Sequence, residues 1–309
     1  MAAPATETVA TVSAHIKKVA VVGGGTMGNG IAQVFASSGF DVHLIDAKAE
    51  FVERALGTIG KNLDRVAKKQ GWDDAKVKGV LGRIFGGTTL DIARDCSLIV
   101  EAVTESFELK KQIFTTLDAV APPNAILASN TSSISLTKLA AATQRPELVI
   151  GLHFMHPVPA MQLVEIVRAL QTSDETYETT CDLARRLGKT IVTTKDMPAF
   201  IVNRLLIPQL NEACFALTEG LGTVEEIDLA IRLGLNHPMG PFQLADLLGL
   251  DTVLTIAEVL QHEFGDDKYR PPTILRNYVA AGWLGRKSGR GFYRYQDEHS
   301  EPASESKLK

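Results

Sequence analysis

Residues 151–165, with the sequence GLHFMHPVPAMQLVE, place two histidines and a carboxylate within one short stretch. Residues 149–154 have the β-branched and apolar pattern of a buried strand, and Pro157 and Pro159 prevent its continuation. A histidine therefore lies at a strand end, where open α/β sheets bind their ligands. Such a histidine can act in proton transfer or can be a hydrogen-bonded packing residue. The stretch alone does not decide between His153 and His156.

The sequence offers no convincing metal ligands. The two histidines are three residues apart, but a proline follows the second, so no helix can carry them as paired ligands. Cys96, Cys181 and Cys214 are odd in number, widely spaced and set in apolar contexts. We interpret them as reduced core residues and predict no metal.

A second group of residues is suited to binding a dinucleotide. Residues 17–23 form a strand pattern, a helical run begins just after GGGTMG, and residues 41–46 form a second strand pattern. The intervening G-x-G-x-x-G consists of Gly23, Gly25 and Gly28. Gly23 would permit a tight turn, Gly25 would let backbone N–H groups approach a pyrophosphate, and Gly28 would let the helix pack closely on the strand.

Asp46 ends the second strand about 20 residues after the glycines, as the dinucleotide fingerprint requires. Its carboxylate can accept hydrogen bonds from both ribose hydroxyls and would repel a 2′-phosphate, which favours NAD over NADP. Lys48, two residues further on, weakens that preference. The glycines alone would also suit an ordinary turn, but their place between a strand and a helix favours the nucleotide interpretation.

Residues 48–82 are predicted to form a helical arm, with a long amphipathic helix and a shorter one over residues 74–81. The apolar stripe of the long helix comprises Phe51, Ala55, Ile59, Leu63 and Val66. Its other face is basic, with Arg54, Lys61, Arg65, Lys68 and Lys69. Such a face can be plain solvated surface, or it can meet a second phosphate-bearing ligand.

The remaining part of the first domain alternates strands and helices, which predicts a doubly wound parallel sheet of the α/β class. The expected elements are strands at 98–103, 125–129, 166–168 and 189–194, and helices at 107–120 and 173–187. Polar residues stand at or past two strand ends: Glu101, Glu105, Lys110 and residues 130–133. They border the same crevice, although Ser133 or Ser135 could simply cap a helix.

Beyond Pro198 no strand pattern is found, so residues 16–197 are predicted to be a Rossmann-type nucleotide-binding domain and residues 198–295 an all-helical domain. Helices are expected at 200–219 with a kink at Pro208, from a Thr223–Glu226 capping box to Gly234, and at 241–248, 251–264 and 272–281. Residues 1–15 and 296–309 lack apolar anchors and are expected to be flexible. An apolar excess predicts a homodimer through the second domain: Leu205, Leu206, Leu210, Leu247, Leu248, Val253 and Ile256.

Composition excludes several classes of protein. The chain has 309 residues, 45% of them hydrophobic and 22% charged, with a net charge of -4. This composition supplies a core and leaves no basic excess for nucleic acid or anionic lipid. No apolar run reaches the ~18 residues of a membrane span, and residues 1–15 contain no Lys or Arg as a leader would. We expect a cytoplasmic protein with neither nucleic-acid nor membrane partners.

Six motifs together resemble the NAD-dependent 3-hydroxyacyl-CoA dehydrogenase family, in its small single-function bacterial form. They are VAVVGGGTMGNGIAQVFASSG, SNTSSIS, GLHFMHPVPAMQLVEIV, FIVNRLL, HPMGPFQLAD and GRKSGRGFY, in register over about residues 16–295. The resemblance implies hydride transfer between C3 of a short-chain acyl-CoA and the nicotinamide of NAD, interconverting 3-hydroxyacyl-CoA and 3-ketoacyl-CoA.

The resemblance also implies roles for individual residues. His153 would be the general base, Glu165 would orient it, and Ser132 and Asn203 would bind the reacting oxygens. The implied cofactor-binding residues are Gly23, Gly24, Gly25, Thr26, Met27, Gly28, Asp46, Glu105, Lys110, Asn130 and Lys287. Asn62 and Lys69 match positions that contact CoA, which favours ligand binding over plain surface for the basic arm.

One residue departs from the family pattern, because His156 stands where the family usually has Asn. A second ionisable group there would add an acid limb to the pH dependence. Two other functions remain as alternatives: a sugar-acid dehydrogenase related to the crystallin-like members of the fold, and a noncatalytic NAD-binding structural or regulatory protein. The basic arm argues against the first, and the set of Ser132, His153, Glu165 and Asn203 argues against the second.

Overall fold

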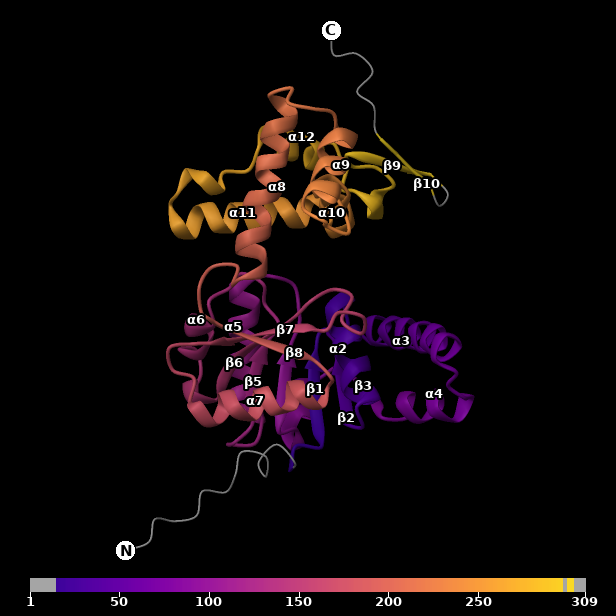
Figure 1. The fold of residues 1–309 in the computed structure, drawn as a ribbon. Helices are drawn as coiled ribbons and strands as arrows, with labels where there is room; N and C mark the ends of the chain where they lie inside the picture. The colour runs from indigo at the N-terminus through magenta and orange to yellow at the C-terminus, as the bar shows by residue number, and fades with distance from the viewer. Residues whose placement is uncertain (1–14, 297–298, 303–309) are drawn as a thin grey trace, which may run out of the picture. The chain divides into compact units, whose positions relative to one another are not determined.

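A computed structural model describes residues 15–296 and 299–302, and the chain divides into two compact units, Met1–Met197 and Pro198–Lys309. Most of the two segments expected to be flexible, 1–15 and 296–309, lies outside the described residues. The N-terminal unit is built on an eight-stranded sheet with the order β3-β2-β1-β4-β5-β6-β7-β8 (Figure 1). Its strands are β1 Lys18–Val22, β2 Asp41–Ile45, β3 Ile84–Gly87, β4 Leu98–Glu101, β5 Ile126–Ser129, β6 Val149–Phe154, β7 Leu163–Arg168 and β8 Thr190–Lys195.

The predicted α/β class is confirmed, with two corrections to the sheet. In the order of the sheet, all neighbouring strands from β3 through β2, β1, β4 and β5 to β6 pair in parallel. Strand β7 pairs antiparallel with β6, and β8 pairs in parallel with β7. Strand β7 begins at Leu163, so Glu165 lies inside a strand rather than before one. Strand β3 was not expected from the sequence.

The helices of this unit follow the strands as the alternation predicts. They are α2 Thr26–Ser37, α3 Ala49–Gln70, α4 Asp74–Leu81, α5 Phe107–Val120, α6 Leu136–Ala140 and α7 Asp174–Arg186. Helices α3 and α4 lie side by side and extend away from the sheet as the predicted arm (Figure 1). Gly71, with φ 69°, ends α3, and the Asp73 side chain caps α4 by accepting from the Lys76 N–H.

Burial of one face holds α3 in place. Ala55, Ile59 and Leu63 of the predicted apolar stripe are buried, together with Val52. Full burial of a side chain as large as that of Val52, Ile59 or Leu63 contributes roughly 1.5–3 kcal/mol. The opposite face of α3 therefore stays available for contacts with a ligand.

The C-terminal unit consists mainly of helices: α8 Val202–Thr218, α9 Val224–Gly234, α10 Pro241–Leu248, α11 Leu250–Phe264 and α12 Thr273–Ala280. Helix α8 continues through Pro208. The capping box that starts α9 is confirmed, with Thr223 N–H donating to Glu226 and Glu226 N–H donating to the Thr223 hydroxyl. An antiparallel hairpin of β9 Tyr293–Gln296 and β10 His299–Pro302 departs from the all-helical expectation.

Two buried carboxylates bind the parts of this unit together. Asp228 of α9 accepts from the N–H groups of Phe242 and Gln243 at the start of α10 and from the Tyr293 hydroxyl. Asp246 of α10 accepts from the N–H groups of residues 292 and 293 at 3.0 and 2.9 Å and from the Tyr295 hydroxyl at 2.9 Å. None of the helices in the described part of the chain is long and apolar enough to cross a membrane.

Candidate active site

The reversal of the sheet at β6 and β7 brings His153 and Glu165 together. The two residues are directly opposite each other in the antiparallel pair, and His153 Nδ1 lies 2.7 Å from Glu165 Oε2. His153 is 6% exposed and Glu165 is fully buried. A carboxylate in this position favours the tautomer that carries the proton on Nδ1, which places the basic lone pair on Nε2.

The loop between β6 and β7 is anchored from two sides. The buried Lys189 ammonium donates to the carbonyl oxygens of Val158 at 2.6 Å and Met161 at 2.7 Å. A Cβ atom on Gly30 of α2 would lie 3.0 Å from the Val158 side chain, so helix and loop are packed closely together. Burial lowers the pKa of Lys189. Sequence reasoning missed this residue, because a lone lysine before a strand resembles ordinary surface.

His156 is exposed on this loop and lines a pocket of about 450 Å³. The same pocket is lined by Gly24 and Gly25 of the glycine loop and by Arg54 and Asn62 of α3. The structure therefore brings Asn62, which the resemblance assigns to CoA, onto one pocket with His156. Lys69 is exposed in the last turn of α3, beyond that lining.

The glycine loop has the geometry that a dinucleotide requires. Gly23 has φ 104°, and a Cβ on Gly28 would lie 1.7 Å from the Gly23 carbonyl oxygen, so the turn and the helix contact both need glycine. A Cβ on Gly25 would meet no atom within 4 Å, which leaves this backbone open to a ligand. Thr26 opens α2, and Met27 packs on the core.

Asp46 closes the loop on the other side. Its Oδ2 accepts from the Gly24 N–H at 2.6 Å, and its Oδ1 accepts from the Ala47 N–H at 2.7 Å. With Gly23, Gly25 and Phe51 it lines a largely apolar pocket of about 510 Å³ beyond the ends of β1, β2 and β4. A carboxylate beside an apolar pocket and open backbone N–H groups fits the adenosine half of NAD.

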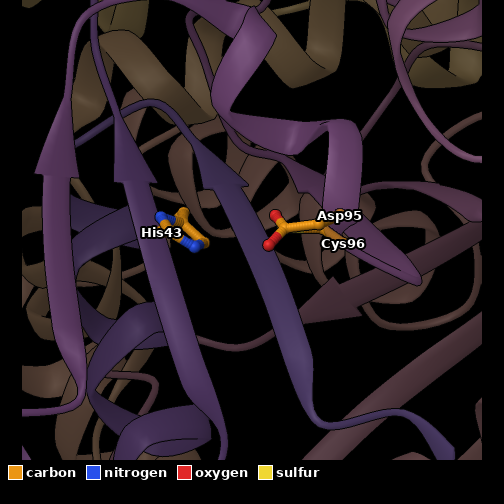
Figure 2. Close-up of side chains that lie close together, drawn as sticks. All are labelled: His43, Asp95 and Cys96. Atoms are coloured by element: carbon orange, nitrogen blue, oxygen red, sulfur yellow. The ribbon is translucent and has the colours of Figure 1, made fainter.

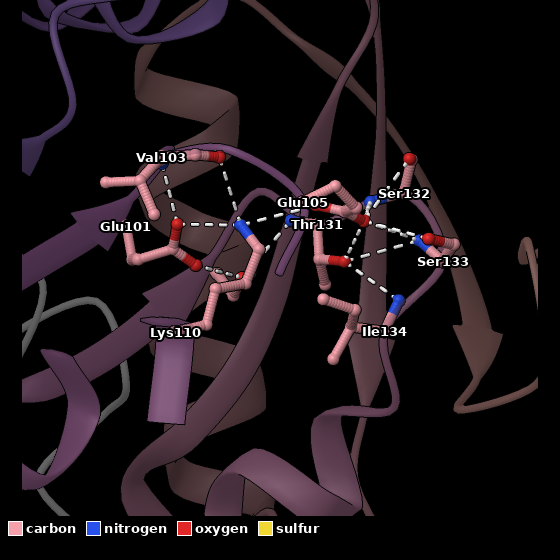
Figure 3. A network of polar contacts seen from close by, with 9 residues as sticks. Glu101, Val103, Glu105, Lys110, Thr131, Ser132, Ser133 and Ile134 are labelled. Carbon is pink, nitrogen blue, oxygen red and sulfur yellow. Dashed lines mark hydrogen bonds and ion pairs between the residues drawn. The ribbon is translucent and has the colours of Figure 1, made fainter. Parts of the chain in front are cut away.

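The serine-rich loop after β5 is organised by Glu105 (Figure 3). Its Oε1 accepts from the N–H groups of Ser132 at 2.9 Å and Ser133 at 3.1 Å, from the Ser133 hydroxyl at 3.0 Å and from the Thr131 hydroxyl. Ser133 thus binds Glu105 rather than capping a helix, whereas Ser135 caps α6.

Asn130 connects this loop to the strand that carries His153. Its side-chain oxygen accepts from the Phe154 N–H at 2.9 Å, and its own N–H donates to the Glu101 carbonyl at 2.8 Å. Lys110 is 1% exposed, so its ammonium lies below the surface of the site. Ser132 thus lies in the loop after β5, and His153 lies near the end of β6, the neighbouring strand of the same sheet.

Two predicted site residues belong to the C-terminal unit. Asn203 is half-buried in the first turn of α8. Lys287 follows α12, and its ammonium pairs with Asp251 of α11 at 2.6 Å.

Among the described residues, His43, Asp95 and Cys96 form one group whose ligand atoms lie within 4.8 Å of one another (Figure 2). The Asp95 carboxylate is already paired with the Lys18 ammonium, and the Cys96 sulfur lies 4.0 Å from its other oxygen. Burial, aided by the charge of Asp95, raises the pKa of the Cys96 thiol to about 12. The Lys18 ion pair holds the Asp95 carboxylate and the Cys96 side chain is buried, and we assign no ligand to this cluster. The three cysteines are all buried and unbridged, as predicted.

Comparisons with known proteins identify the family. The model of the 3-hydroxyacyl-CoA dehydrogenase NAD binding domain matches residues 18–197, and the model of that family's C-terminal domain matches residues 200–295. A 3-hydroxybutyryl-CoA dehydrogenase of Bradyrhizobium diazoefficiens is 52% identical over 94% of this chain and 99% of its own length. A probable 3-hydroxybutyryl-CoA dehydrogenase of Bacillus subtilis is 49% identical over 93% of this chain and 100% of its own length.

A solved structure gives the same result. The (S)-3-hydroxybutyryl-CoA dehydrogenase of Ralstonia eutropha is 48% identical and has a TM-score of 0.87, with 91% of this chain and 100% of that chain covered. The resemblance inferred from the six sequence motifs is confirmed. The chain belongs to the 3-hydroxyacyl-CoA dehydrogenase family of NAD-dependent oxidoreductases.

Proposed function

We propose that the chain interconverts (S)-3-hydroxybutyryl-CoA and acetoacetyl-CoA with NAD as the hydride carrier. The relatives that are about half identical over nearly their whole length are named for this substrate. The observation that carries the proposal is the buried pair of His153 and Glu165 at 2.7 Å, which supplies an oriented base at a strand end.

In this proposal His153 accepts the hydroxyl proton on Nε2 as hydride leaves C3, and it returns the proton in the reverse direction. Glu165 keeps the ring in the required tautomer and stabilises the imidazolium that forms. Ser132 and Asn203 donate hydrogen bonds to the reacting oxygens. NAD, when bound, supplies or accepts the hydride.

We further propose which residues hold the two ligands. The open backbone of Gly23 to Gly28 and the Asp46 carboxylate support binding of the pyrophosphate and adenosine ribose. Glu105, Lys110, Asn130 and Lys287 complete the cofactor set proposed from the resemblance. Asn62 and Lys69 on the arm of residues 48–82 would bind the phosphates of CoA.

A substrate series tests this function. We expect NADH oxidation with acetoacetyl-CoA to be faster than with longer 3-ketoacyl-CoAs, and NADPH to be the poorer reductant because Asp46 repels a 2′-phosphate. Initial rates with each pair of substrates provide the measurement. Inactivity with every 3-ketoacyl-CoA would overturn the proposal, and activity with sugar acids instead would favour the alternative dehydrogenase.

We also propose that residues 198–295 form a substrate and dimerisation domain, that residues 16–197 form the NAD-binding domain, and that the enzyme acts in the cytoplasm. Leu205, at 70% exposed, and Leu247 and Leu248, at 45% and 39%, support a dimer surface. Three residues of the apolar set predicted for the dimer surface are instead buried in the core of this unit: Leu210, Val253 and Ile256. Four more leucines of this unit are exposed: Leu221, Leu229, Leu233 and Leu235.

The dimer surface can be tested by a single charge. Leu233, 70% exposed on α9, should shift the protein to a monomer when replaced with Glu, because a buried unpaired carboxylate at an apolar interface is costly. Leu170→Glu is the matched control, since Leu170 is 89% exposed in the N-terminal unit. Sedimentation velocity at micromolar concentration would decide, and a monomeric wild-type protein would refute the proposal.

A further inference from the structure

A buried ion pair of Glu101 and Lys110 lies next to the loop that carries Ser132, and Glu101 has no role in the function proposed above. Glu101, the last residue of β4, is fully buried, and Lys110 of α5 is 1% exposed. The Lys110 ammonium donates to Glu101 Oε1 at 2.7 Å. Buried charges are costly unless they are paired and hydrogen-bonded, so a pair of this kind calls for an explanation.

Both carboxylate oxygens of Glu101 have partners in the protein. Its Oε1 also accepts from the Val103 N–H at 2.7 Å, and its Oε2 accepts from the Ser129 hydroxyl at 2.7 Å. Ser129 is the last residue of β5, just before the serine-rich loop. Glu101 therefore joins the ends of two neighbouring strands and fixes the ammonium between them (Figure 3).

The Lys110 ammonium in turn lies close to three oxygen atoms of the protein. Besides Glu101, the ammonium donates to the Val103 carbonyl at 3.3 Å and lies 3.3 Å from Glu105 Oε2. With two hydrogen bonds to protein acceptors, a second carboxylate at 3.3 Å and almost no exposed surface, Lys110 is placed to hold Glu105.

Glu105 transmits this arrangement to the loop. One carboxylate oxygen faces Lys110, and the other accepts from the Ser132 and Ser133 N–H groups and from the Thr131 hydroxyl. The Thr131 hydroxyl accepts in turn from the Ile134 N–H at 2.9 Å. The Glu105 carboxylate thus fixes the backbone at Ser132, and Lys110 in turn fixes the Glu105 carboxylate.

We propose that Glu101 and Lys110 are positioning residues, which hold the Glu105 carboxylate in the one place where it shapes residues 131–134 and presents the Ser132 side chain. The proposal rests on the role proposed above for Ser132.

The charges support this chain of contacts. The charged groups that face the Glu105 carboxylate are Lys110 on α5 and, across it, Glu101 on β4, while the loop after β5 presents hydroxyls and backbone amides. Burial alone would raise the pKa of Glu105, but the Lys110 charge and the hydrogen bonds from residues 131–133 outweigh it and lower the pKa. Glu105 therefore stays an ionised acceptor at neutral pH.

The test needs a variant that removes the ammonium without leaving an unpaired buried charge. Lys110→Met alone would strand Glu101, so the main variant is Glu101→Gln with Lys110→Met, which replaces both charges by neutral side chains of similar size. Lys111→Met is the matched control, because Lys111 is the next residue of the same helix and is exposed. Each change is also made in a Ser132→Ala background.

Two measurements separate the positioning role from the proposed function. Hydrogen exchange followed by mass spectrometry on peptides spanning residues 130–135 reports the order of the loop without reference to catalysis. Steady-state rates with acetoacetyl-CoA and NADH report how far the order of this loop affects catalysis. We expect at least tenfold faster exchange in this segment and a roughly 10- to 100-fold lower kcat with little change in KM, and no change in Lys111→Met.

The Ser132→Ala background decides how the effect arises. If the pair acts through Ser132, its removal should change kcat less than threefold once Ser132 is already Ala. Unchanged exchange in residues 130–135, or an undiminished loss of kcat in the Ser132→Ala background, would overturn the proposal. Faster exchange combined with a fully active Ser132→Ala enzyme would support the clamp on the loop and would refute the proposed role of Ser132.

Discussion

Replacing His153 with Gln should lower kcat roughly 10²- to 10⁴-fold, the usual contribution of a positioned general base. The imidazole is the group proposed to take the hydroxyl proton, and it is held 2.7 Å from Glu165 on the adjacent strand. An amide cannot take its place in proton transfer. Steady-state rates in both directions, together with the NADH dissociation constant, would separate a loss of chemistry from a loss of binding.

Gln is the appropriate substitution because Glu165 is fully buried. An alanine would remove the imidazole that faces this buried carboxylate, at a cost of about 3–5 kcal/mol, whereas a glutamine amide can still donate to it. His262→Gln, on the exposed part of α11, is the matched control and should be as active as the wild type. Near-normal turnover of His153→Gln would reassign the base.

Glu165→Gln completes this comparison. The new amide can donate to Nδ1, which would move the ring proton to Nε2 and so block the atom that should accept the substrate proton. A loss of kcat as large as that of His153→Gln would support control of the His153 tautomer by Glu165. A double variant no slower than either single variant would show that the two residues act as one unit.

Replacing Asp246 with Ala should destabilise the C-terminal unit by about 2–5 kcal/mol. The side chain is 1% exposed and accepts three hydrogen bonds that join α10 to β9, so its removal leaves three donors unpaired. The enzyme contains two tryptophans, Trp72 in the N-terminal unit and Trp283 in the C-terminal unit. In a Trp72→Phe background, urea unfolding followed by fluorescence therefore reports the C-terminal unit alone.

Two controls make the Asp246 result specific. Glu212→Ala, on the exposed side of α8, should change the free energy of unfolding by less than about 0.5 kcal/mol.

Burial raises the pKa of Asp246, opposed by its hydrogen bonds, so the folded unit binds this proton more tightly than the unfolded chain. The associated stability is greatest at low pH and is lost as pH rises from about 4 through the raised value, and that loss should be absent in Asp246→Ala. Equal midpoints for the variant and the wild type would contradict the structural role.

Local chemistry made much of the fold predictable from sequence. The glycine loop, the α4 bounds and the Thr223–Glu226 capping box each depend on residues within one turn or one βαβ unit. The same holds for Asp46, whose place follows from its spacing after the glycines. These features are fixed by steric and hydrogen-bonding rules that act over short distances in the chain.

The features that were missed depend on pairing between distant segments. The four residues of β3 include two glycines and show no strand alternation. The direction of β7 follows from which strand it pairs with, which no local pattern encodes. The buried partners of Glu101 and the side of α11 that packs inward likewise become visible only when neighbouring elements are in place, which is why Val253 and Ile256 were counted as surface.

The antiparallel pairing of β6 with β7 has a consequence for how this enzyme can diverge. Because the histidine and its carboxylate are held across a strand pair, their separation is set by sheet geometry and not by the length of the eight residues between the two strands. Insertions or substitutions in that connection can therefore alter the loop without changing how His153 and Glu165 face each other.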